Sequence, residues 1–144
     1  GQVSIEFFYK KNIYSHFHQS IKTTTGTMEI SKPEITAFDL VRYMDASGQV
    51  NQVATVLCEL AERLDPLILA ELLKKNEVEI TAAQRLGYLL DILQLPVNLD
   101  LLAAELKQKK TSARLLVVGS NQPIIEHNRR WHILVNEPVE PDEL

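Results

Sequence analysis

The sequence predicts a helix most plainly at residues 81–93, TAAQRLGYLLDIL. Thr81 and Gln84 have the spacing of a capping box, in which the two side chains satisfy free amides of the first turn. Gly87 lies inside this helix at a cost of about 1 kcal/mol relative to alanine, so we expect another backbone segment to approach closely there. The apolar residues at helical spacing, which we expect to form the buried stripe of this helix, are Ala83, Leu86, Leu90 and Leu93.

Four more helices are predicted on either side of this one, between residues 31 and 106. The first follows a cap at Ser31, the second a cap at Asn51, and the third the pair Asp65 and Pro66. The last comes after the break at Pro96. Each segment repeats apolar residues at spacings of three and four, which predicts one buried face per helix.

Strands are predicted at both ends of the chain. Residues 3–9 alternate apolar and polar side chains, and residues 21–31 hold two β-branched runs around Gly26, as a hairpin does. Residues 115–118 form a short apolar run, and residues 131–135 alternate again. Because strands and helices are segregated, we expect an α+β fold in which a central block of about five helices is flanked by an N-terminal strand and hairpin and by C-terminal strands, with a small, mostly antiparallel sheet.

Composition indicates one globular domain over residues 1–144. The chain has a mass of 16.4 kDa, with 45% hydrophobic and 24% charged residues, enough to bury a core without disulfides. Cys58 has no partner for an intrachain disulfide, which fits a reducing cytosol, and we expect it to be a small buried hydrophobe. The sequence has no apolar run of membrane-spanning length and no signal-peptide pattern, so we expect a cytoplasmic protein.

Charge is unevenly distributed along the chain. The net charge of −4 argues against a protein that coats nucleic acid, yet residues 107–130 alone sum to +5 and the last eight residues to −4. The basic stretch predicts phosphate contacts, and a solvated basic loop is the alternative. The candidate phosphate contacts, with two lysines near the start, are Lys10, Lys11, Lys107, Lys109, Lys110, Arg114, Arg129 and Arg130.

No enzymatic motif is complete. His16 and His18 have the spacing of two metal ligands but lack a third and a fourth, and residues 115–120 resemble a nucleotidyltransferase turn without its paired carboxylates. Glu105 and Lys107 match a nuclease motif, but residues two apart on a helix diverge. We therefore expect no catalytic residues, metal or cofactor. A metal-dependent nucleic-acid-processing enzyme and a purely structural oligomerisation module remain as alternatives.

Polar residues inserted between core positions are more informative. Asp39 lies one helical turn from both Arg42 and Tyr43 and can meet either of them, and Arg85 has the same relation to Tyr88. Such groups could form a functional site, or they could tie the helices to the sheet.

Five segments, in order, resemble the C-terminal domain of the AbiEi antitoxins. The resemblance covers nearly the whole chain, and the ordered set is more specific than any one segment. The segments are IEFFYKK at 5–11, TAFDLVRY at 36–43, NQVATVL at 51–57, QRLGYLL at 84–90, and WHILVN at 131–136 followed by VEPD at 139–142.

The resemblance implies a type IV toxin–antitoxin component with a role in abortive infection and phage defence. Its toxin would be nucleotidyltransferase-like, and a functional rather than a stable physical partner. Family members also carry an N-terminal winged helix-turn-helix that binds operator DNA and represses transcription of the operon. This chain opens on Gly1 in a strand-like segment, so we expect the winged domain to be absent from it. The motif polar positions, to which no catalytic role is assigned, are Asp39, Arg42, Asn51, Gln84, Arg85, Tyr88 and Asn136.

Overall fold

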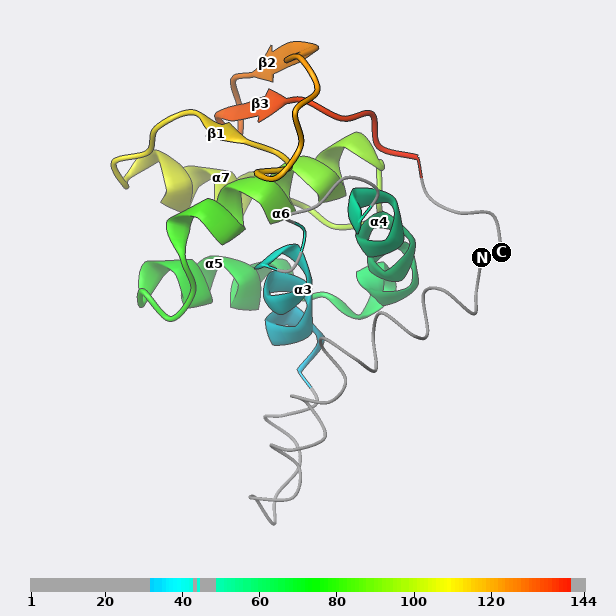
Figure 1. The fold of residues 1–144 in the computed structure, drawn as a ribbon. Helices are drawn as coiled ribbons and strands as arrows, with labels where there is room; N and C mark the ends of the chain where they lie inside the picture. Colours follow the sequence, from blue (N-terminus) through cyan, green and yellow to red (C-terminus); the bar gives the residue numbers. More distant parts are fainter. Residues whose placement is uncertain (1–31, 43, 45–48, 141–144) are drawn as a thin grey trace, which may run out of the picture.

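The computed structural model of the chain describes residues 32–42, 44 and 49–140 (Figure 1). Several predictions fall outside these residues: the strand at 3–9, the hairpin at 21–31, the phosphate contacts Lys10 and Lys11, and the pair His16 and His18.

Five α-helices lie within the described residues, as the apolar spacings predict. Asp65 caps the third of them, because its side chain accepts a hydrogen bond of 2.9 Å from the Leu67 amide. A short 3-10 helix, η2, follows the second. The bounds are α3 Pro33–Arg42, α4 Gln49–Leu60, η2 Ala61–Arg63, α5 Pro66–Lys74, α6 Ile80–Ile92 and α7 Asp100–Lys107.

Two predicted helix caps are wrong. The helix α4 begins at Gln49, so Asn51 lies in its first turn, where the side chain accepts a 2.7 Å hydrogen bond from the Glu140 amide. The helix α6 begins at Ile80, and Gln84 does not reach back to Thr81. Gln84 is fully buried and faces the sheet instead. Its amide donates to backbone carbonyls that are enclosed there, and leaving those carbonyls without a donor would cost more than leaving the first turn of α6 uncapped.

The C-terminal strands form a three-stranded sheet of order β1-β3-β2. Strand β1 (Arg114–Leu115) runs parallel to β3 (Ile133–Val135), and β2 (Glu126–Asn128) runs antiparallel to β3. The α+β class is confirmed. The sheet is mixed rather than mostly antiparallel, because the chain reverses direction twice between β1 and β3, and β2 was not predicted.

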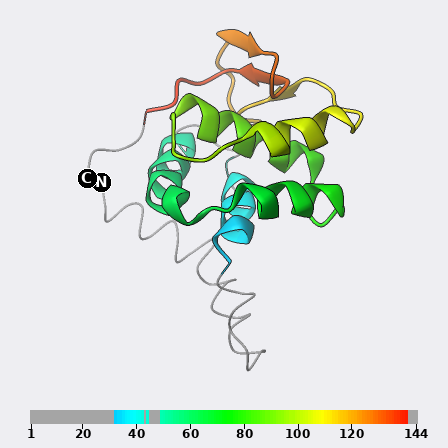
Figure 2. The same cartoon turned by 180° about the vertical axis from the view of Figure 1, so that it is seen from behind.

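The elements stack in layers around α6 (Figures 1 and 2). The sheet lies on one side of α6 and α7, while α3 and α5 lie on the other. The core runs through all of these layers and includes fully buried Phe38, Leu57, Leu73, Leu86 and Trp131. Within the described ranges, no helix is both long and apolar enough to span a membrane.

Gly87 is where α6 meets the sheet region most closely. A Cβ atom at this position would lie 2.2 Å from the ring of Trp131, which is fully buried. The expected close approach is therefore present, but an aromatic side chain makes it, not a second backbone. Trp131 fills the notch that glycine leaves on the helix.

Candidate functional site

The seven motif polar residues do not converge in one cleft. Gln84, Arg85, Tyr88 and Asn136 lie where α6 meets the sheet region, Asp39 and Arg42 lie on α3, and Asn51 binds the backbone near the end of the described chain. The two larger groups differ in burial, which decides what each can do.

Gln84 joins α6 to three carbonyl groups of the C-terminal region. Its Nε2 lies 3.0 Å from the carbonyl oxygen of Ser112, and 3.2 Å from those of Trp131 and His132. The Oε1 atom is buried and has no hydrogen-bond partner among the described residues. This amide holds the sheet against the helix, since a buried carbonyl without a donor destabilises the fold.

Asn136 performs a similar task inside the sheet region. Its Nδ2 donates to the Val117 carbonyl at 2.8 Å, and its Oδ1 accepts from the Val117 amide at 3.0 Å. The buried side chain thus continues the pairing to Val117, two residues beyond the end of β1. Tyr88 is also buried, and burial together with the Glu126 carboxylate raises the pKa of its hydroxyl.

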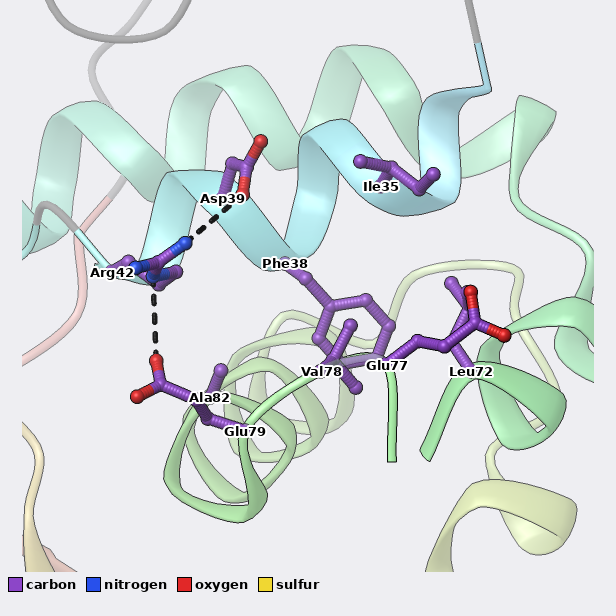
Figure 3. Close-up of a pocket in the computed structure, with 9 residues that line it drawn as sticks. All are labelled: Ile35, Phe38, Asp39, Arg42, Leu72, Glu77, Val78, Glu79 and Ala82. Carbon is purple, nitrogen blue, oxygen red and sulfur yellow. Dashed lines mark ion pairs between the residues drawn. The ribbon is translucent and has the colours of Figure 1, made fainter. Parts of the chain in front are cut away.

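A groove of about 370 Å³ lies between α3 and the connection from α5 to α6 (Figure 3). Its floor is apolar, with the Phe38 ring at the centre, and its rim is charged. The apolar lining comprises Ile35, Phe38, Leu72, Val78 and Ala82, and the charged rim comprises Asp39, Arg42, Glu77 and Glu79.

Arg42 connects the two walls of this groove, as the dashed lines of Figure 3 show. Its Nη1 lies 3.7 Å from Asp39 Oδ1, and its Nε lies 3.3 Å from Glu79 Oε1. The predicted contact between Asp39 and Arg42 is confirmed, and Glu79 was not anticipated. The Arg42 and Glu79 side chains are 57% and 66% exposed, so solvent screens the pair and it contributes little to stability.

Two of the candidate phosphate contacts are already engaged within the protein. Arg130 bridges Asp91 and Asp100 at 3.0 and 2.9 Å, with its guanidinium 5.2 Å from the centre of the Trp131 ring. Lys109 Nζ donates to Asn76 Oδ1 at 2.7 Å. The other candidates in the described chain, all of them exposed, are Lys107, Lys110, Arg114 and Arg129.

The cysteine prediction is wrong, because Cys58 is exposed on α4. It follows core Leu57 by one residue, which turns it about 100° away from the buried stripe. His127 and His132 stack with ring centres 5.5 Å apart. Residues 32–42, 44 and 49–140 contain no group of three histidine, cysteine or acidic side chains placed to hold a metal ion.

Glu79 and Asp91 are two site residues that the sequence did not predict. Asp91 Oδ2 accepts hydrogen bonds from both Trp131 Nε1, at 2.8 Å, and Arg130. The only signal in the sequence is that Asp91 interrupts the apolar end of α6, so its partner forty residues later could not be inferred.

Comparison with known proteins bears on the groove more than on the sheet. The family model for the AbiEi antitoxin C-terminal domain matches residues 2–92, more than half of the chain. Neither the curated proteins nor the solved structures gave a significant match. The matched residues include α3, α5 and α6, and hence the whole lining of the groove.

Proposed function

Because the chain belongs to the AbiEi antitoxin C-terminal domain family, we propose that it is the antitoxin domain of a type IV toxin–antitoxin system. It would counteract a nucleotidyltransferase-like toxin in the cytoplasm without catalysing a reaction and without holding that toxin in a stable complex. The family match carries this proposal, and it includes every residue that lines the groove.

The groove is the surface through which we propose that the domain acts. Its apolar floor can bind an apolar group, and its charged rim can orient a polar one. Arg42 and Glu79 are both exposed and their pair adds little to stability, so it is available for exchange with a ligand. Because the toxin is not expected to stay bound, the ligand need not be the toxin.

Expression of this chain in cells that produce the cognate toxin tests the proposal. We expect the chain to restore growth, because it belongs to the family of AbiEi antitoxin C-terminal domains. Toxin-producing cells that carry the empty vector provide the baseline. Failure to restore growth by a folded chain present at comparable levels would contradict the proposal and favour a structural oligomerisation module.

A second part of the proposal concerns DNA. In a protein that also carries a winged helix-turn-helix, the exposed basic residues of this domain would add sequence-independent phosphate contacts on the operator. Arg129→Glu in that protein should weaken operator binding and flatten its salt dependence, with Arg63→Glu on η2 as the control. Arg130→Glu is less suitable, because it also breaks the contacts with Asp91 and Asp100. Unchanged binding of the Arg129 variant would contradict this part.

A further inference from the structure

Two arginines from different elements lie near the edge of β1 that does not pair with β3. Arg85 of α6 donates from Nε to the carbonyl oxygen of Leu115 at 3.1 Å, and Arg114 is the preceding residue of β1. Among the described residues β1 pairs only with β3, and Arg85 of α6 lies at its other edge.

Neither guanidinium is compensated by an ion pair. Within the described residues, no carboxylate lies within 4.0 Å of Arg85 or of Arg114. Glu79 is the acidic group that acts on Arg85 at longer range, and it is already paired with Arg42 at 3.3 Å. Arg42 in turn pairs with both Asp39 and Glu79, so these three arginines and two carboxylates together carry a net charge of +1.

This arrangement is electrostatically unfavourable in the absence of an anion. Partial burial of Arg85 and the nearby charge of Arg114 both lower the pKa of Arg85, and Glu79 only partly opposes them. Functional sites concentrate ionisable groups that are perturbed by burial and by like charges, and Arg85 is such a group.

A backbone donor lies at the same edge. The amides of Arg114 and Leu116 both donate to β3, to the carbonyl oxygens of His132 and Leu134. Because alternate residues of a strand direct their backbone groups to opposite edges, the Leu115 N–H is directed away from β3. It is directed to the same side as the Leu115 carbonyl, which binds Arg85.

We propose that Arg85, Arg114 and the Leu115 amide form a binding site for a phosphate-class oxyanion. Guanidinium groups present several N–H donors in a plane and match the oxygens of a phosphate. The backbone N–H adds a donor that approaches the anion from a third direction. The oxyanion could belong to a free phosphate compound or to a nucleic-acid backbone, because the chemistry at the site is the same. The site is separate from the groove and does not depend on the antitoxin function.

Titration of the ¹⁵N-labelled chain at constant ionic strength tests this site, with sodium pyrophosphate in one arm and a 12-base-pair DNA duplex in the other. We expect saturable NMR shifts of the Leu115 amide and the Arg85 Nε–H in at least one arm. A response to pyrophosphate identifies a free phosphate compound as sufficient, and a response to the duplex alone identifies the nucleic-acid backbone as the source.

Three variants distinguish binding at this site from attraction of the anion by the overall charge of the protein. Arg114→Gln, at an exposed position, should weaken the affinity about tenfold, which corresponds to about 1.4 kcal/mol. Arg85→Lys keeps the charge but loses the planar donor set, so it should also weaken binding. Arg63→Gln removes one exposed charge on η2 and should leave the affinity unchanged. Absence of saturable shifts in both arms, or an equal loss in the Arg114 and Arg63 variants, overturns the proposal.

Discussion

The contact region between α6 and the sheet and the groove beside α3 both contain motif polar residues, but the two regions use them differently. In the first region Gln84 and Asn136 are buried and bind backbone groups. In the groove Arg42 pairs with Glu79, and both side chains are exposed. A polar residue inside an apolar pattern can therefore belong to the fold or to a surface site, and burial distinguishes the two cases.

This difference predicts a separation of effects. Substitutions in the contact region should change the free energy of unfolding, because they leave buried groups unpaired or crowded. Substitutions in the groove should leave stability almost unchanged and affect the function. The following predictions test the separation, from the largest expected change in stability to the smallest.

Gly87→Ala should destabilise the protein by about 3 kcal/mol, because the added Cβ would lie 2.2 Å from the buried Trp131 ring. Urea unfolding measures the change. In a Trp131→Leu background the same substitution should be neutral or stabilising by up to about 1 kcal/mol, since alanine favours a helix and the ring is gone. An equal loss in both backgrounds would show that the ring is not the cause.

Gln84→Leu should destabilise the protein by about 2 kcal/mol. The leucine supplies no donor for the carbonyls of Ser112, Trp131 and His132. Gln52→Leu on α4, where the side chain is only partly buried, is the matched control and should stay within about 0.5 kcal/mol of the wild type. If the two variants unfold at the same urea concentration, the Gln84 contacts do not stabilise the sheet.

Tyr88 should make stability depend on pH in the alkaline range. Its pKa is raised in the folded protein, so the unfolded chain loses this proton first, near pH 10. The Tyr88 contribution is therefore present below about pH 10 and is lost as the pH rises toward the folded pKa. Tyr88→Phe should reduce this loss when thermal unfolding is followed from pH 9 to 11. Identical slopes for the variant and the wild type would exclude Tyr88 as its source.

Arg42→Gln should change the free energy of unfolding by less than about 0.5 kcal/mol, because Arg42 and Glu79 are exposed and the contact of Arg42 with the partly buried Asp39 is long, at 3.7 Å. Thermal unfolding at low and high salt checks this. Lys75→Gln removes a comparable exposed pair with Glu71 and provides the control. A loss above 1 kcal/mol for Arg42→Gln alone would place Arg42 in the structural group.

Local periodicity was sufficient to predict the five helices and the α+β class, because apolar spacing and the Asp65 cap are properties of short segments. It was not sufficient for β2, or for the role of Gln84, because both depend on residues far away in the sequence. Gln84 fits a capping box as well as it fits a buried donor. Only the positions of Ser112 and Trp131 decide between these roles.

The candidate site was predicted in part. The pairing of Asp39 with Arg42 follows from one turn of helix, and it is observed. Glu79 comes from the start of α6, so its contact with Arg42 arises only when α3 packs against that helix. The basic stretch shows the same limit, since the acidic partners of Arg130 lie 30 and 39 residues earlier in the sequence.

Toxin rescue by Arg42→Gln, measured together with thermal stability, tests the separation of the two regions most directly. We expect this variant to melt within about 2 °C of the wild type yet to restore the growth of toxin-producing cells poorly, while Lys75→Gln restores it fully. Full rescue by an Arg42→Gln variant of normal stability and normal level would contradict the assignment of the groove as the functional surface.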